Sequence, residues 1–239
     1  MQKSMIRILS LADIITLINA VLGFLALLIV FSNQLQIAAC LILLGLLFDG
    51  LDGIVARRMR KSGIGEYLEA IADMVSLSIA PLALLYNMYY GAVFSELYLH
   101  LLLGIVLVIS FVCSVIRLSS FSLLKQKQFF LGLPTSASAI FLVVASFLKP
   151  DVLYILPVIV ILSLAMISSI LFPKPGLKMN LITAVLVIAT IFLQNMYSNI
   201  ASLLLLVGLI SYIIFGPVYL LVKKRKLQTM NGAVVEGEN

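Results

Sequence analysis

Apolar stretches long enough to cross a lipid bilayer recur from one end of this chain to the other. A membrane-spanning helix needs about 20 such residues. Only 11% of the residues are charged and the mean hydropathy is +1.20, whereas a soluble domain carries roughly 25% charged residues. Because lipid offers no hydrogen-bond partners, the backbone of each stretch must satisfy its own polar groups, which predicts helices. We therefore expect an all-α, polytopic membrane helix bundle.

Polar and turn-forming residues divide this apolar sequence into about eight transmembrane helices. The expected spans cover residues 11–31, 35–58, 65–90, 96–118, 134–147, 152–171, 181–193 and 200–222. Residues 1–226 are expected to form a single membrane domain. The remaining segment, 227–239, is short and polar, so we expect a disordered tail.

The basic residues cluster between the apolar runs. If the N-terminus lies inside the cell, Lys149 is the only one of the sixteen basic residues in an outer loop. The positive-inside rule then places both termini in the cytoplasm, which requires an even number of spans. Six spans satisfy the same condition, so parity leaves six and eight open. This charge distribution indicates membrane topology and contact with anionic lipids, not nucleic-acid binding.

Half of the ten acidic residues fall within one 25-residue stretch, as Asp49, Asp52, Glu66, Glu69 and Asp73. Carboxylates within membrane helices cost several kcal/mol and usually mark function. Asp49 and Asp52 share one helix face at the end of the second span, and Glu69 and Asp73 share one at the start of the third. The short connection 58–64 brings both faces together, so these four carboxylates predict a site for Mg²⁺, Mn²⁺ or Ca²⁺. The alternative is that the acids only pair with basic residues of the connection.

Small and basic residues accompany the acids. Gly53 and Ala56 let a ligand approach the second span closely, and Arg57 offers a fixed positive fork suited to phosphate. Ser62 and Gly65 lie in the turn before the third span, where free backbone N–H groups can meet an anion. Together these residues predict a diphosphate site beside the metal. Packing of helices through small residues is the alternative.

The acidic stretch resembles the signature of the CDP-alcohol phosphatidyltransferase family, D-x2-D-G-x2-A-R-x8-G-x3-D-x3-D. Residues 49–57 match its first half at every specified position. The second half departs twice: seven residues separate Arg57 from Gly65, and Glu69 stands where the family has its third aspartate. We hypothesise an active enzyme whose metal preference is altered by Glu69.

Further segments resemble the serine branch of that family. They are Thr16-Leu17-Ile18-Asn19 with Gly23, Asp73-Met74-Val75-Ser76 with Ala80-Pro81, Arg117-Leu118-Ser119, Gly132-Leu133-Pro134-Thr135, and the stretch 168–173. The resemblance implies an enzyme of phospholipid biosynthesis with about eight spans. It would transfer a phosphatidyl or archaetidyl group from CDP-diacylglycerol or CDP-archaeol to L-serine and release CMP. It also implies a homodimer in the cell membrane, with the active site facing the cytoplasm.

The resemblance further implies roles for individual residues. Asp49, Asp52 and Glu69 would bind the divalent cation, and Asp73 would act as the general base and as a ligand. Apart from the resemblance, Arg117 within the fourth span could bind the carboxylate of serine. The residues implied in CDP binding are Gly53, Ala56, Arg57, Ser62, Gly65 and Asn19.

Three other functions remain open at this stage. The first is the same chemistry with glycerol 3-phosphate or an inositol phosphate as acceptor, for which Arg117, Lys125 and Lys127 would supply a basic pocket. The second is an ion transporter or cation channel, because acids within membranes also mark ion pathways. The third is an inactive paralogue that binds the CDP-lipid without turnover, which the glutamate at position 69 would explain.

Overall fold

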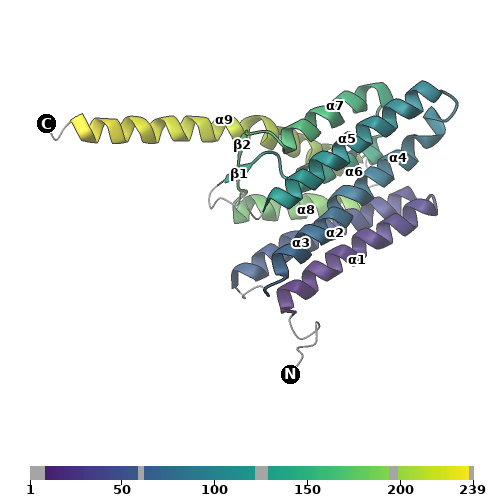
Figure 1. Cartoon of the computed structure of the whole chain (residues 1–239), viewed down its shortest axis with the longest axis horizontal. Coiled ribbons are helices and arrows are strands. Elements are labelled where there is room, and N and C mark those ends of the chain that lie inside the picture. Colours follow the sequence, from purple (N-terminus) through teal and green to yellow (C-terminus); the bar gives the residue numbers. More distant parts are fainter. Residues whose placement is uncertain (1–8, 59–61, 122–128, 194–198, 237–239) are drawn as a thin grey trace.

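Helices form nearly all of the computed structural model. The structure describes residues 9–58, 62–121, 129–193 and 199–236, with side chains described throughout except within 52–58 and 223–236. Its elements, in chain order, are α1 (Leu11–Phe31), α2 (Leu35–Arg58), α3 (Gly65–Asp73), the π-helix η2 (Met74–Ile79), α4 (Ala80–Val93), α5 (Leu97–Phe121), β1 (Phe129–Leu131), α6 (Thr135–Leu148), α7 (Val152–Met166), β2 (Leu171–Pro173), α8 (Leu177–Leu193) and α9 (Ile200–Glu236). Because α3, η2 and α4 form one continuous helix, Gly65–Val93, the described residues make eight helices (Figure 1).

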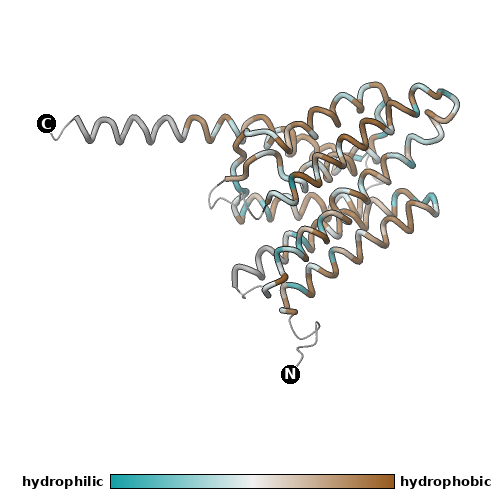
Figure 2. The backbone as a smooth tube through the Cα atoms, viewed as in Figure 1, coloured by the Kyte–Doolittle hydropathy of each residue, from teal (hydrophilic) through white to brown (hydrophobic). Residues whose placement is uncertain are grey.

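The prediction of an all-helical membrane bundle is confirmed. Within the described part of the chain, four helical stretches are long and apolar enough to cross a membrane: Leu11–Phe31, Gly65–Val93, Leu97–Phe121 and Ile200–Val222. Four shorter apolar helices, Leu35–Leu51, Thr135–Leu148, Val152–Met166 and Leu177–Leu193, accompany them. Figure 2 shows apolar residues along most of the described helices, with polar residues gathered towards their ends. The cytoplasmic location of the termini stays a prediction.

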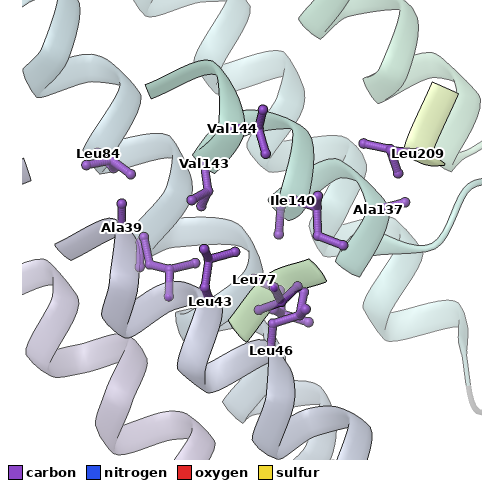
Figure 3. Close-up of a cluster of buried hydrophobic side chains, with 14 of the residues drawn as sticks. Ala39, Leu43, Leu46, Leu77, Leu84, Ala137, Ile140, Val143, Val144 and Leu209 are labelled. Carbon is purple, nitrogen blue, oxygen red and sulfur yellow. The ribbon is translucent and has the colours of Figure 1, made fainter. Parts of the chain in front are cut away.

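Helix α6 lies at the centre of the bundle. Its 14 residues reach only about 21 Å, which is shorter than the roughly 30 Å hydrocarbon core. Most of its side chains are buried against other helices. Ile140 and Val143 of α6 point towards Leu43 of α2 and Leu77 of η2 (Figure 3). The helix that carries the first half of the motif therefore packs against both α6 and the helix that carries the second half.

Two acidic residues at span ends act as helix caps. The Ser10 side chain accepts a hydrogen bond from the backbone of Asp13, and Asp13 accepts one from the Ser10 backbone at 2.7 Å, which forms a capping box at the start of α1. Asp151 accepts a hydrogen bond from the backbone of Leu153 at 2.8 Å and caps α7. Both residues are thereby given a structural role.

A two-stranded antiparallel sheet interrupts the helical pattern, and the sequence did not predict it. Phe130 of β1 pairs with Phe172 of β2. The sixth span, expected over 152–171, therefore ends at Met166 and the chain turns into β2. Apolar residues resume at Ile170 after Ser168 and Ser169, so hydropathy averaged over the run did not reveal the end of the helix. Figure 1 places the sheet at the end of the bundle where α3 begins.

Helix α9 is the last element of the chain, and its part Ile200–Val222 is long and apolar enough to cross a membrane. Its backbone extends to Glu236, beyond the other helices (Figure 1). The disordered tail expected over 227–239 stays a prediction. The expected boundary of the membrane domain at residue 226 stays a prediction.

Candidate active site

Asp73 lies where α3 passes into the π-helix η2. The backbone amide of Ala80 donates to the carbonyl oxygen of Val75, five residues earlier, which is the wider spacing of a π-helix. The next residue, Pro81, has no amide hydrogen to continue the ladder. Short π-helical segments within α-helices are frequent at functional sites. The last acid of the motif therefore lies directly beside a local widening of its helix.

Helix α1 lies very close to the junction of α3 and η2, because the residue of α1 at the contact is Gly23, which has no side chain. A Cβ atom on Gly23 would lie 2.5 Å from the Cα of Ser76. Real Cβ atoms do not come that close to backbone, so only glycine fits at position 23. The Ser76 hydroxyl bonds back to the carbonyl oxygen of Ala72 at 3.0 Å and stays within its own helix. The close contact holds α1 against the first turn of η2.

One turn before Gly23 on α1, Asn19 contacts Asp73. Its Nδ2 donates a hydrogen bond to Oδ1 of Asp73 at 3.1 Å, between residues 54 positions apart. The Asn19 side chain is fully buried. Its Oδ1 has no hydrogen-bond partner, and a Cβ atom on Gly45 of α2 would lie 3.0 Å from that oxygen. Helices α1, α2 and α3 thus meet around a single buried amide.

The carboxylates of the motif lie at this end of the bundle. Asp49, Glu69 and Asp73 are half-buried, and Glu66 is exposed. Among the side chains that the structure describes, no three acidic, histidine or cysteine residues are grouped closely enough to hold a metal ion. Asp52, the fourth predicted ligand, lies outside those described side chains, as do Gly53, Ala56 and Arg57.

Ser62 and Gly65 come together at the start of α3. The backbone amide of Gly65 donates to the carbonyl oxygen of Ser62 at 3.1 Å. The Ser62 hydroxyl is buried and has no hydrogen-bond partner, and the N-cap residue Ile64 provides no side-chain cap. A buried hydroxyl and an uncapped helix N-terminus together suit an anionic ligand.

Arg117 lies near the last turn of α5, at the same end of the bundle as the motif but on another side of it. Only 9% of the residue is exposed. Its Nε donates to the carbonyl oxygen of Leu133 at 3.3 Å, and its guanidinium carbon lies 5.5 Å from the centre of the Phe121 ring. A guanidinium group has further N–H donors with which to bind a carboxylate.

The sheet supports the loop that Arg117 contacts. Gly132 follows β1 with φ +75°, and a Cβ atom there would lie 2.2 Å from the carbonyl oxygen of Met166. The Gly132 amide donates to the carbonyl oxygen of Ile170 at 2.8 Å. Tyr212 of α9 donates its hydroxyl to the carbonyl oxygen of Pro173 at 3.0 Å. The two segments 129–133 and 171–173 are therefore fastened to α7 and α9.

Comparison with known proteins identifies the family. The family model for CDP-alcohol phosphatidyltransferase matches residues 9–214, which include every described element up to the middle of α9. The chain belongs to the CDP-alcohol phosphatidyltransferase family. It is therefore a transferase of phospholipid biosynthesis and a membrane protein.

Individual relatives agree with this assignment. The chain is similar to an archaetidylserine synthase of Methanothermobacter thermautotrophicus, with 31% identity over 72% of this chain and 73% of the relative. It is 36% identical to a CDP-diacylglycerol–serine O-phosphatidyltransferase of Methanocaldococcus jannaschii, over 70% of this chain and 76% of the relative. A protein of the same name from Helicobacter pylori is 28% identical over 88% of this chain and 92% of the relative.

The donor atoms of the motif fit the cation on which CDP-alcohol phosphatidyltransferases generally depend. Asp49, Asp52, Glu69 and Asp73 offer only carboxylate oxygens, which are the ligands that Mg²⁺ and Mn²⁺ prefer. Because three of these groups are only partly buried, water and substrate oxygens have access to complete a coordination shell. The donor chemistry is therefore that of a hard divalent cation.

Two features of the site go beyond the predictions from the sequence. The first is the contact of Asn19 with Asp73, since the resemblance had implied that Asn19 binds CDP. The second is the sheet that joins the family segments 132–135 and 168–173. A signal for the sheet was present, because the short aromatic runs Phe129-Phe130 and Phe172 adjoin Gly132 and Pro173, and such runs next to Gly or Pro are typical of strands.

Proposed function

We propose that this CDP-alcohol phosphatidyltransferase moves a phosphatidyl or archaetidyl group from a CDP-linked lipid to L-serine and releases CMP. The observation that carries the proposal is the alignment of at least 70% of the chain with relatives whose names state serine transfer. The motif supports it, because its acids lie at the end of α2 and in α3, at one end of a membrane bundle. A lipid substrate and a water-soluble one can meet there.

Asp49, Asp52, Glu69 and Asp73 would hold the divalent cation. Bound there, the cation would neutralise the diphosphate and stabilise the departing CMP, which is the main requirement of phosphoryl transfer. Gly53 and Ala56 would let the diphosphate approach α2, and Arg57 would pair with it. These assignments rest on the match of residues 49–57 to the family motif.

Ser62 and Gly65 would contact the same CDP moiety from the start of α3. The support is the buried, unpartnered Ser62 hydroxyl beside an uncapped helix N-terminus. Phosphate oxygens accept hydrogen bonds from hydroxyl groups and from backbone amides at such positions.

Asp73 would take the proton from the serine hydroxyl as that oxygen attacks phosphorus. A carboxylate within hydrogen-bond reach of the nucleophile can act in this way. Arg117 would pair with the serine carboxylate, and its burial supports that role because a buried guanidinium binds an anion more strongly than an exposed one. The orientation of the site towards the cytoplasm and a homodimeric assembly complete the proposal.

The test is an acceptor comparison with the purified protein in liposomes that contain CDP-diacylglycerol or CDP-archaeol. CMP release and the lipid product are measured with L-serine, glycerol 3-phosphate or inositol phosphate as acceptor, at fixed Mg²⁺ or Mn²⁺. We expect turnover with serine and a phosphatidylserine or archaetidylserine product. Turnover with a phosphorylated acceptor and none with serine would overturn the choice of acceptor.

Two further outcomes would replace the proposal altogether. Binding of the CDP-lipid without CMP release under any metal would indicate an inactive paralogue. Cation flux across the liposome membrane in the absence of CDP-lipid would indicate a transporter or channel. Each is measured in the same liposomes, so a single preparation compares all three functions.

A further inference from the structure

Asn19 occupies a position suited to orienting another side chain. It projects from the middle of α1 into the interior, where it is fully buried. The contact that its amide nitrogen makes is with Oδ1 of Asp73, at 3.1 Å. The residue thus lies behind the acid that would act on the acceptor hydroxyl.

A hydrogen bond to one carboxylate oxygen restricts rotation of the whole group. An aspartate side chain can turn about its terminal bond through a broad range of angles. The amide of Asn19 favours the angle at which Oδ1 faces α1, and this directs Oδ2 away from α1. The carboxylate has about four lone-pair sites in all, so the bond from Asn19 leaves it able to accept further protons or to bind a cation.

Gly45 provides the space for this arrangement. The Oδ1 atom of Asn19 points towards α2, and a Cβ atom at position 45 would lie 3.0 Å from it. That separation is tighter than ordinary van der Waals contact, so alanine there would displace the amide. The close contact of Gly23 with Ser76 fixes α1 against η2 one turn further along. The amide is therefore held from two sides by close helix packing.

We propose that Asn19 is a positioning residue for Asp73, not a contact to the nucleotide, and that Gly45 admits its amide. This inference rests on the proposed function, because it assumes that Asp73 acts on the acceptor. It assigns Asn19 an effect on the rate of the chemical step. Binding of the CDP-lipid would not depend on it.

The first test is the Asn19→Leu variant, whose side chain branches at the same atom and has no hydrogen-bond donor. We expect kcat to fall about 10- to 100-fold, the effect of losing one hydrogen bond to a charged group. The KM for the CDP-lipid and the dissociation constant for CDP, measured by calorimetry, should change less than about twofold. A rise in either constant with kcat unchanged would overturn the inference, because it would show a nucleotide contact.

A double-mutant cycle with Asp73→Asn separates the two proposals. In the Asp73→Asn background, Asn19→Leu should lower the residual rate no further, since its effect passes through Asp73. Additive losses would overturn the positioning role and leave the proposed function intact. If the wild-type protein releases no CMP, the proposed function fails and the inference fails with it. If Asp73→Asn keeps full activity, Asp73 is not the base, and the inference fails while transfer to serine stands.

Gly45→Ala gives an independent test that keeps the asparagine. It should lower kcat about 3- to 30-fold through displacement of the amide, with CDP binding unchanged. The matched control is Gly104→Ala in α5, where a Cβ atom meets nothing within 4 Å. Equal effects at the two glycines would overturn the inference. If Asn19→Leu elutes as aggregate from size-exclusion chromatography in detergent, the Gly45 and Gly104 pair decides alone.

Discussion

Arg117 donates a hydrogen bond from Nε to the carbonyl oxygen of Leu133 at 3.3 Å, so that the end of α5 is joined to the loop after β1. The guanidinium is fixed on one side by this bond and on another by the Phe121 ring, whose centre lies 5.5 Å away. A cation held in this way is pre-oriented for an anionic group. Under the proposed function that group is the carboxylate of serine.

Substitution of Arg117 by lysine should therefore weaken acceptor binding. Lysine keeps the charge but lacks the planar fork that pairs with both oxygens of a carboxylate. We expect the KM for serine to rise about 10- to 100-fold, which corresponds to roughly 1.5–3 kcal/mol. Steady-state kinetics with each substrate varied in turn measures the effect.

The same kinetics distinguish an acceptor contact from a nucleotide contact. The KM for the CDP-lipid should stay constant in Arg117→Lys. A matched control is Lys149→Met, since Lys149 is exposed at the C-terminal end of α6, the end opposite the β1 loop. An increase only in the KM for the CDP-lipid would assign Arg117 to the nucleotide.

Gly132→Ala should destabilise the protein. The new Cβ atom would lie 2.2 Å from the backbone oxygen of Met166, and the residue would have to keep a φ of +75°. Backbone atoms cannot move aside as a flexible side chain can. We expect a loss of about 2–4 kcal/mol in the free energy of unfolding, measured as a lower thermal midpoint in detergent. Gly176→Ala is the control, because a Cβ atom there meets nothing within 4 Å, and it should leave the midpoint within about 2 °C.

Gly23→Ala should separate α1 from the π-helix. Its Cβ atom would lie 2.5 Å from the Cα of Ser76, so one helix must shift. Overpacking of this kind costs about 1–3 kcal/mol, and the shift would also lengthen the contact of Asn19 with Asp73. We therefore expect a lower thermal midpoint together with reduced CMP release. A Cβ atom on Gly208 of α9 would meet nothing within 4 Å. Gly208→Ala should therefore be neutral or slightly stabilising, because alanine favours helix. Equal losses from both substitutions would contradict the close packing.

Helices were predictable wherever a long apolar run ends at a polar turn. The first span, expected over 11–31, coincides with α1, since Ser10 and Asp13 cap its start and Ser32-Asn33 follow its end. The sixth span was expected to reach residue 171 and ends at Met166. Apolar residues continue into β2, and hydropathy cannot distinguish a helix from a buried strand over so few residues. Residues 171–173 form a strand because they pair with β1, about 40 positions earlier in the chain.

The site was predictable as a set of residue types but not as a set of contacts. The spacing of Glu69 and Asp73 placed both correctly on one helix, because local periodicity determines which residues share a face. The bond from Asn19 to Asp73 joins residues 54 positions apart. It depends on how closely α1 and η2 pack, and that distance is set by the absence of a side chain at Gly23. No periodic pattern in a single sequence carries this information.

Glu69→Asp would test the departure of this chain from its family's motif. Aspartate is one methylene shorter, so the carboxylate would withdraw from the bound cation or draw it towards α3. Mg²⁺ requires nearly ideal octahedral geometry, so we expect the Mg²⁺ concentration for half-maximal CMP release to change about tenfold and the ratio of rates with Mn²⁺ and Mg²⁺ to change with it. The control is Glu66→Asp, an exposed residue one turn earlier on α3 that lies outside the motif, and it should leave both quantities unchanged. If Glu69→Asp leaves the rate and the metal dependence as in the wild type, Glu69 is not a ligand and the altered metal preference has no basis.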